Sequence, residues 1–197
     1  MSKISPCVNL HVRGDKMAKG LKKTVVLVGM MGAGKTAVGK AIAQILNVPF
    51  LDSDAEIELA ADRTIAEIFE RDGEPFFRTK ESQVIERLLN DERCILSTGG
   101  GAYMRADNRE MILEKGVAVW LKVDLNILWQ RVRHRNTRPL LQTANPYETL
   151  RDLAQTREPM YAKAEIVVEA EPGLSVEQMA QKVVDALVAH GGIVKDT

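Results

Sequence analysis

Short apolar runs alternate with stretches of helical periodicity along most of the chain. Five runs are brief and rich in β-branched residues, which is typical of strands buried in a parallel sheet. These predicted strands span 24–28, 48–51, 94–96, 117–121 and 166–168. The predicted helices cover 36–46, a segment opened by a capping box at 64–67, 76–90 and 176–188. The alternation predicts an α/β fold, a doubly wound five-stranded parallel sheet flanked by helices.

The first twenty residues lack this alternation. Prolines, glycines and charges follow one another there without a sustained period, so we predict a flexible N-terminal arm at 1–20. Met17 is a candidate start of the native chain, because the residues after it lead directly into the first strand. No internal repeat or low-complexity tract interrupts the remainder, so residues 21–197 are expected to form a single domain.

Composition narrows the range of partners. The 197 residues are 45% hydrophobic, and 27 basic side chains balance 27 acidic ones, which gives no overall electrostatic case for nucleic acid or an anionic membrane. No apolar run approaches the roughly 18 residues of a membrane helix. Cys7 and Cys94 are too few for a disulfide framework, and the N-terminus lacks the apolar stretch of a secretory signal. We therefore expect a cytoplasmic monomer with neither nucleic acid nor a membrane as partner.

One motif carries most of the chemical information. Residues 29–36 read GMMGAGKT, the pattern of a phosphate-binding loop, between a predicted strand and a predicted helix. Glycines let backbone N–H groups close around phosphate oxygens, Lys35 can reach the β- and γ-phosphates, and the Thr36 hydroxyl can bind Mg²⁺. The alternative is a glycine turn that only joins strand to helix. The expected nucleotide-binding residues are Gly32, Ala33, Gly34, Lys35, Thr36 and Ala37.

Two carboxylates follow at the end of the second predicted strand. Asp52 and Asp54 alternate with Ser53, so in extended backbone both would point to the same side, beside the phosphate site. One could then hold a metal ion while the other handles a substrate hydroxyl. The alternative is a cluster that caps the next helix.

Three further segments admit both a functional and an ordinary interpretation. Arg78 could bind a carboxylate, with Glu81 orienting it across one helical turn, or the two could form a solvated ion pair. The glycines at 99–101 could present N–H donors to a ligand or form a plain loop. Residues 131–138 hold four arginines, which suit a solvated loop, a small nucleic-acid patch or a lid over a transferring phosphoryl group.

Six blocks in order give the chain a family resemblance. It resembles the shikimate kinase family over about 24–190, through GMMGAGKT, LDSD, GEPFFRTKE, STGGG, RPLL and REPMY, with the arm outside. The resemblance implies a P-loop kinase fold of the nucleoside-monophosphate-kinase type with a lid, so that 21–197 would be one shikimate-kinase-like domain. It also implies ATP as co-substrate, Mg²⁺ as metal and shikimate as acceptor. The reaction would be phosphorylation of the shikimate 3-hydroxyl to shikimate 3-phosphate, in aromatic amino-acid (chorismate) biosynthesis.

The resemblance assigns a catalytic role to individual residues. Lys35 and Thr36 would engage the ATP phosphates and Mg²⁺, and Asp52 would belong to the metal site. Asp54 would bind shikimate hydroxyls and act as the candidate base for the attacking oxygen. Arg138 would reach the γ-phosphoryl group from the lid and complete the catalytic set with Lys35 and Asp54.

Contacts to the two substrates follow the same register. Arg78 and Arg157 would bind the shikimate carboxylate, and Gly100 would donate to shikimate. Arg131 would lie against the adenine, with Arg133 as the alternative for that contact. Around these residues the resemblance places Phe69 and Phe77 in the apolar wall of the shikimate pocket and Pro172 in the adenine loop.

Two other functions compete with this interpretation. A related kinase for gluconate or a nucleoside monophosphate would share the phosphate loop, but two arginines with the Asp pair suit a polyhydroxylated carboxylate better. A nucleotide-dependent switch or a non-catalytic binding module would bind ATP without acceptor-stimulated turnover. The cysteine at 94 opens an apolar strand and is predicted to be core, and no role is assigned to His11, His134 or His190, which lack metal-ligand spacing.

Overall fold

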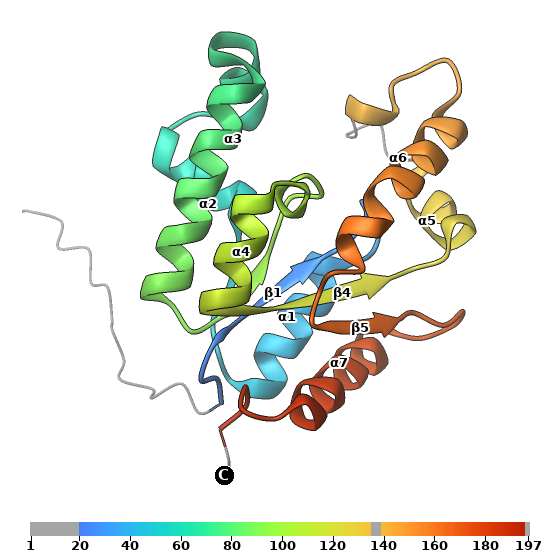
Figure 1. Cartoon of the computed structure of the whole chain (residues 1–197). Coiled ribbons are helices and arrows are strands. Elements are labelled where there is room, and N and C mark those ends of the chain that lie inside the picture. The colour runs from blue at the N-terminus through green and yellow to red at the C-terminus, as the bar shows by residue number, and fades with distance from the viewer. Residues whose placement is uncertain (1–19, 135–138, 196–197) are drawn as a thin grey trace, which may run out of the picture.

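A parallel sheet forms the centre of the molecule (Figure 1). The structure, a computed structural model, describes residues 20–134 and 139–195. The strands are β1 Thr24–Val28, β2 Phe50–Asp52, β3 Ile95–Ser97, β4 Gly116–Lys122 and β5 Ile166–Glu169. They lie in the order β2-β3-β1-β4-β5, and every pairing is parallel. All carboxyl ends therefore meet at one edge, and the chain changes direction across the sheet at β1, where ligands bind in open α/β sheets.

Helices cover both faces of this sheet, which confirms the doubly wound α/β prediction. The α-helices are α1 Lys35–Leu46, α2 Ser53–Ala61, α3 Ile65–Asp91, α4 Ala106–Lys115, α5 Leu125–Val132, α6 Pro146–Tyr161 and α7 Val176–His190. Two short 3₁₀ turns are η1 Ala102–Met104 and η2 Pro139–Leu141. In Figure 1, α1 and α7 pack together below the sheet, whereas α3 and α4 pack together above it.

The apolar strands are buried because both faces are covered. All five residues of β1 are at most 1% exposed, as expected for a central strand between two helical layers. Cys94 is fully buried beside this strand, and burial raises the pKa of its thiol to about 12, which confirms it as a core residue. In the described part of the chain, no helix is both long and apolar enough to cross a membrane.

The strand predictions are confirmed with small shifts of their bounds. β1 has the predicted ends, but β2 spans Phe50–Asp52 instead of 48–51. The cause is the end of α1: Asn47 caps it in the left-handed conformation, and the Val48 N–H donates to the Ala43 carbonyl at 2.9 Å. Residue 48 therefore completes the helix terminus before the strand begins.

The capping box predicted at 64–67 is present and begins α3. The Glu67 N–H donates to the Thr64 hydroxyl at 3.3 Å, and the Thr64 N–H donates back to the Glu67 carboxylate at 2.8 Å. The predicted helices at 64–69 and 76–90 join into one element with a kink at Gly73 (φ 80°, ψ 172°), a conformation that glycine adopts without strain. Beyond the kink, α3 continues to Asp91 and packs against α4.

Contacts between distant residues hold the last turn of α6 and the N-terminal boundary of the fold. α6 continues through Pro159 to Tyr161, whose buried side chain holds the last turn against the sheet. Gly20, assigned to the N-terminal arm, belongs to the folded body, because its carbonyl accepts the Lys195 N–H at 2.7 Å and Leu21 bridges Val194. The rest of the predicted arm, 1–19, lies outside the described residues.

Candidate active site

The phosphate-binding loop lies between β1 and the N-terminus of α1, as its sequence predicts. Gly34 caps α1 in the left-handed conformation (φ 93°), so backbone N–H groups of the first turn face the loop. A side chain at Gly32 (φ 81°) would lie 2.7 Å from Val132 Cγ1, so only glycine fits there. Lys35 Nζ donates to the carbonyls of Gly29 at 2.8 Å and Met30 at 3.1 Å. The loop can thus enclose an anion with N–H donors and one ammonium group.

Asp52 lies next to the phosphate loop. It is the last residue of β2, and the Thr36 hydroxyl donates to its Oδ2 at 3.4 Å. Its Oδ1 accepts the Asp54 N–H at 3.1 Å, so Asp52 also caps α2. Thr36 and Asp52 therefore bring a hydroxyl and a carboxylate together beside the loop, which are ligand types that Mg²⁺ prefers.

Asp54 does not extend the strand, which corrects the expectation of an extended backbone through Asp52 and Asp54, although both residues line the same cavity. It lies in the first turn of α2, and its carboxylate faces Gly99: a side chain there would lie 2.9 Å from Asp54 Oδ1. Burial, and then the charge of Asp52, raise the pKa of Asp54 above its ordinary value, while Lys35 and Arg78 act in the opposite direction. Such a carboxylate, near two cations and short of water, can accept a proton from a bound hydroxyl.

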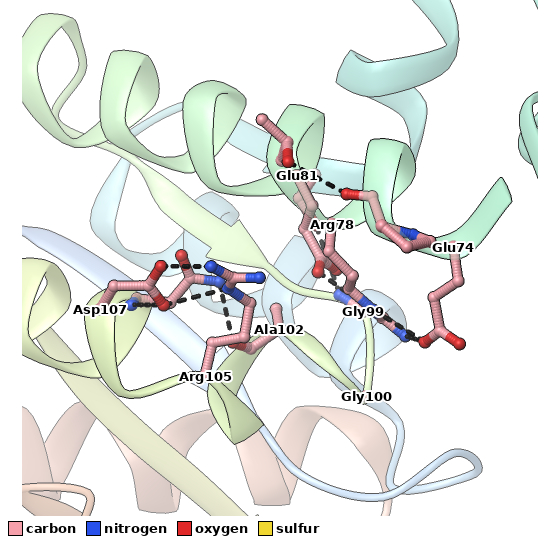
Figure 2. Close-up of polar contacts among 12 residues, drawn as sticks. Glu74, Arg78, Glu81, Gly99, Gly100, Ala102, Arg105 and Asp107 are labelled. Atoms are coloured by element: carbon pink, nitrogen blue, oxygen red, sulfur yellow. Dashed lines mark hydrogen bonds and ion pairs between the residues drawn. The ribbon is translucent and has the colours of Figure 1, made fainter. Parts of the chain in front are cut away.

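Arg78 lies on the second part of α3, between two carboxylates (Figure 2). Its Nη1 donates to Glu81 Oε2 at 2.8 Å, which confirms Glu81 as the orienting partner, and its Nε and Nη2 donate to Glu74 Oε1 at 3.2 and 3.1 Å. Burial lowers the pKa of Arg78, but these ion pairs outweigh burial and raise it. Glu74 was missed in the sequence, although its spacing of four residues from Arg78 is a helical ion-pair signal.

Glu81 is a fully buried carboxylate. Its side chain is 1% exposed, and its Oε1 has no hydrogen-bond partner among the described residues. Burial raises its pKa above the ordinary value, while the hydrogen bond from Arg78 lowers it. The alternative for Arg78 and Glu81, a solvated ion pair, is therefore wrong, because Glu81 is shielded from solvent.

The glycines at 99–101 pass between the functional side chains. The Gly99 N–H donates to the Ser53 hydroxyl at 3.3 Å. A side chain on Gly100 would lie 3.1 Å from Arg157 Nη1, and one on Gly101 would lie 2.8 Å from both Nη atoms of Arg78. A larger residue here would require the guanidinium groups to move, because the backbone approaches both of them closely. The segment is therefore more than a plain loop, since it brings Arg78 and Arg157 to one place.

Arg131 lies at the last turn of α5, with its Nη1 donating to the Gly32 carbonyl at 3.2 Å. A cavity of about 710 Å³ is bounded by the phosphate loop, Arg131, the carboxyl edge of the sheet and the segment after β5. Its lining includes Gly32, Ala33, Gly34, Lys35, Thr36, Ala37, Asp52, Asp54, Gly100 and Arg131, but neither Arg133 nor Pro172. Of the two adenine candidates, the structure therefore places Arg131 at the cavity.

The remaining predicted residues take different positions. Phe77 is buried, and its ring lies 4.7 Å from that of Phe69, which is 37% exposed. Arg138 lies outside the described residues. Among those that are described, no cluster of three or more His, Cys, Asp or Glu side chains could hold a metal ion. Any metal here would therefore need oxygen ligands from a hydroxyl, water or nucleotide as well.

The order of the strands, the phosphate loop on α1 and the carboxylate beside it define a P-loop phosphotransferase. The family model "Shikimate kinase" matches residues 31–188. The chain belongs to the shikimate kinase family, and it is therefore a kinase.

Known proteins agree with this assignment over nearly the whole chain. Shikimate kinase of Cereibacter sphaeroides is 63% identical over 182 residues, covering 92% of this chain and 91% of the relative. Shikimate kinase of Ruegeria pomeroyi is 59% identical over 181 residues, covering 92% and 93%. The structure of shikimate kinase from Acinetobacter baumannii in complex with shikimate is 41% identical, covers 85% of this chain and 94% of its own, and superposes with a TM-score of 0.80.

Proposed function

We propose that this protein transfers the γ-phosphoryl group of ATP to the 3-hydroxyl of shikimate, giving ADP and shikimate 3-phosphate for the biosynthesis of chorismate and aromatic amino acids. The observation that carries the proposal is the meeting of three side chains around one glycine segment. Asp54 faces Gly99, Arg157 faces Gly100 and Arg78 faces Gly101, next to a phosphate-binding loop. A hydroxyl acceptor with a carboxylate at its other end fits one carboxylate base and two guanidinium groups.

The ATP half of the reaction rests on the phosphate loop. Backbone N–H groups from Gly32 to Ala37 and the start of α1 would bind the phosphate oxygens, and Lys35 would turn from the loop carbonyls to the β- and γ-phosphates. Arg131 would contact the adenine, supported by its place on the cavity wall. We assign Arg138 to the γ-phosphoryl group on the family resemblance of its segment.

Thr36 and Asp52 would hold the Mg²⁺ ion of MgATP. The fit rests on their oxygen donors, 3.4 Å apart, with room in the cavity for the waters that Mg²⁺ retains. Bound there, Mg²⁺ would neutralise charge on the phosphate oxygens. The two residues would orient the nucleotide so that its γ-phosphoryl group points toward Asp54.

The acceptor half would use Asp54, Arg78 and Arg157. Arg78 and Arg157 would bind the carboxylate of shikimate, which fixes the ring, and the Gly100 N–H would donate to the ring hydroxyl. Asp54 would accept the proton of the attacking 3-hydroxyl as the new O–P bond forms and the bond to ADP breaks. Its raised pKa suits a group that must take up a proton in this step.

Release of ADP from MgATP, measured with and without shikimate, tests the proposal. Shikimate is expected to stimulate ADP release strongly, and gluconate, which also carries a carboxylate and several hydroxyls, is expected to have no effect. Phosphate found on an oxygen other than O3 by ³¹P and ¹H NMR would contradict the regiochemistry. Stimulation by gluconate alone would instead make the chain a kinase of another acid.

We further propose that the protein acts as a cytoplasmic monomer without a nucleic-acid or membrane partner. The support is the balance of 27 basic and 27 acidic side chains and the absence of a disulfide framework. Light scattering on the eluting protein tests the monomer, because a dimer would appear at twice the 21.8 kDa of the chain.

A further inference from the structure

Tyr161 links the last turn of α6 to the glycine segment. Its side chain is fully buried, and its hydroxyl donates to the Gly100 carbonyl at 2.7 Å. Its ring lies 6.0 Å from that of Trp120 on β4, tilted by 32°. The ring is thus held by packing against the sheet, and the hydroxyl has a defined direction toward one peptide group.

That peptide group lies between the two arginines. The Gly100 carbonyl belongs to the peptide that joins Gly100 to Gly101, and a side chain on either glycine would come within 3.1 Å of a guanidinium nitrogen, of Arg157 or of Arg78. The Ala102 N–H donates to the Gly99 carbonyl at 3.1 Å and closes a turn around this peptide. Glycines tolerate either orientation of the central peptide of such a turn, so a further partner is needed to select one. The Tyr161 hydroxyl is such a partner, and it lies on the same helix as Arg157, one turn further on.

The next part of the chain is fixed in a similar way. The Asn108 side-chain amide, fully buried on α4, donates to the Ala102 carbonyl at 2.9 Å. The glycine segment is therefore held on one side by Tyr161 and beyond Gly101 by Asn108. Of these two contacts, the one from Tyr161 acts directly between the arginines.

We propose that Tyr161 is a positioning residue of the acceptor site, which fixes the Gly100–Gly101 peptide and thereby sets the distance between Arg78 and Arg157 that a carboxylate must match. The proposal deepens the function proposed above, since it rests on these two arginines binding the carboxylate of shikimate. Tyr161 itself does not need to touch the substrate. It acts through the backbone of Gly100 and through its side-chain hydrogen bond with Arg157.

The protonation state of Tyr161 agrees with this role. Burial raises the pKa of its hydroxyl to about 12, although the nearby Arg157 acts in the opposite direction. The hydroxyl therefore stays protonated at neutral pH and remains a donor to the carbonyl. A tyrosinate could not donate this hydrogen bond.

Tyr161→Phe tests the proposal, because it keeps the ring and its packing against Trp120 while it removes the hydroxyl. We expect the KM for shikimate to rise roughly fivefold to tenfold, the size expected when a buried carbonyl loses its partner. The KM for ATP should stay within about twofold of wild type. Ala154→Gly is the matched control: it lies on the buried side of α6 and lowers helix stability without touching the hydroxyl. It should lower the Tm and leave the KM for shikimate unchanged.

A second measurement separates this proposal from the proposed function. ¹⁵N-labelled protein without substrate reports on the backbone directly, and Tyr161→Phe should shift or broaden the amide signals of Gly100 and Gly101 but not those of Gly32 and Gly34. Unchanged glycine signals, or equal rises in the KM for shikimate and ATP, would overturn the positioning role. Shifted glycine signals in a protein that does not phosphorylate shikimate would support the anchor and overturn the assigned acceptor.

Discussion

Adding one methyl group to the glycine segment should disable the acceptor site without unfolding the protein. Gly101 has ordinary backbone angles (φ −93°, ψ −18°), so alanine is allowed there. The new Cβ would nevertheless lie 2.8 Å from both Nη atoms of Arg78, whereas ordinary van der Waals contact begins at about 3.4 Å. Gly101→Ala therefore requires the guanidinium group to retreat by about 0.6 Å.

Arg78 cannot retreat freely, because it is bound to the buried Glu81. Leaving a buried carboxylate without its cation costs about 3–5 kcal/mol, so the ion pair should persist in a displaced position. Crowding of this kind costs about 1–3 kcal/mol, partly offset by about 0.4–1 kcal/mol from the stiffer unfolded chain. A displaced Arg78 would lose its hydrogen bonds to the substrate carboxylate, and hydrogen bonds to a charged group contribute about 1.5–3 kcal/mol. The loss of these bonds to the substrate corresponds to a rise of about tenfold to a hundredfold in the KM for shikimate.

The measurement is a coupled assay of ADP release with shikimate and ATP titrated separately, together with a thermal melt. Gly191→Ala is the control for a loss of stability alone, because its positive φ (75°) strains alanine there whereas its new methyl group meets no atom within 4 Å. A double-mutant cycle with Arg78→Ala isolates the route: once Arg78 is absent, the Gly101 methyl group should add little. A KM for shikimate within twofold of wild type in Gly101→Ala would refute the assignment of Arg78 to the acceptor.

Three further predictions address other parts of the molecule. Lys35→Ala should abolish ADP release with the fold retained, as followed by circular dichroism, and a near-normal rate would remove the phosphate-loop assignment. Folding raises the pKa of the Asp54 carboxyl above its unfolded value of 3.8, so the folded state favours the protonated form. The group therefore contributes to folding stability at pH values below 3.8, and this contribution is lost as the pH rises through the pKa of the folded state. Asp54→Asn should therefore raise the Tm at neutral pH, lose that advantage below the unfolded pKa, and abolish phosphorylation; a lower Tm at neutral pH would contradict this. Thr64→Ala should lower the free energy of unfolding by about 1 kcal/mol through loss of the capping box, with no change in either KM.

The parts of the molecule that were predictable from sequence are those determined by neighbours in the chain. The β1 strand, the phosphate loop and the start of α3 each depend on a few consecutive residues, so a pattern of apolar, glycine and capping positions is enough to find them. The ion pair between Arg78 and Glu81 was predictable for the same reason, since it spans one helical turn.

Contacts between distant residues were not predictable in this way. Tyr161 and Gly100 are 61 positions apart, and no local pattern indicates that a tyrosine after a proline turns toward a glycine carbonyl. The continuation of α6 through Pro159 has the same origin. Proline loses one hydrogen bond of the helix, but the burial of Tyr161 against Trp120 stabilises the turn that follows. Tertiary packing outweighs the local preference here.

The pair Asp52 and Asp54 shows how a local departure from a regular strand can separate two functions. In a continuous strand both carboxylates would face the phosphate loop, where they would repel each other and compete for the same cation. Instead the backbone passes from strand to helix at Asp52, and the Asp54 N–H donates to the Asp52 carboxylate as the helix begins. Asp52 thereby stays beside Thr36, and Asp54 faces Gly99, where the charges of Lys35 and Arg78 act on it. The helix-cap interpretation of this segment is therefore correct, and under the proposed function the same cap would direct Asp52 to the nucleotide and Asp54 to the acceptor.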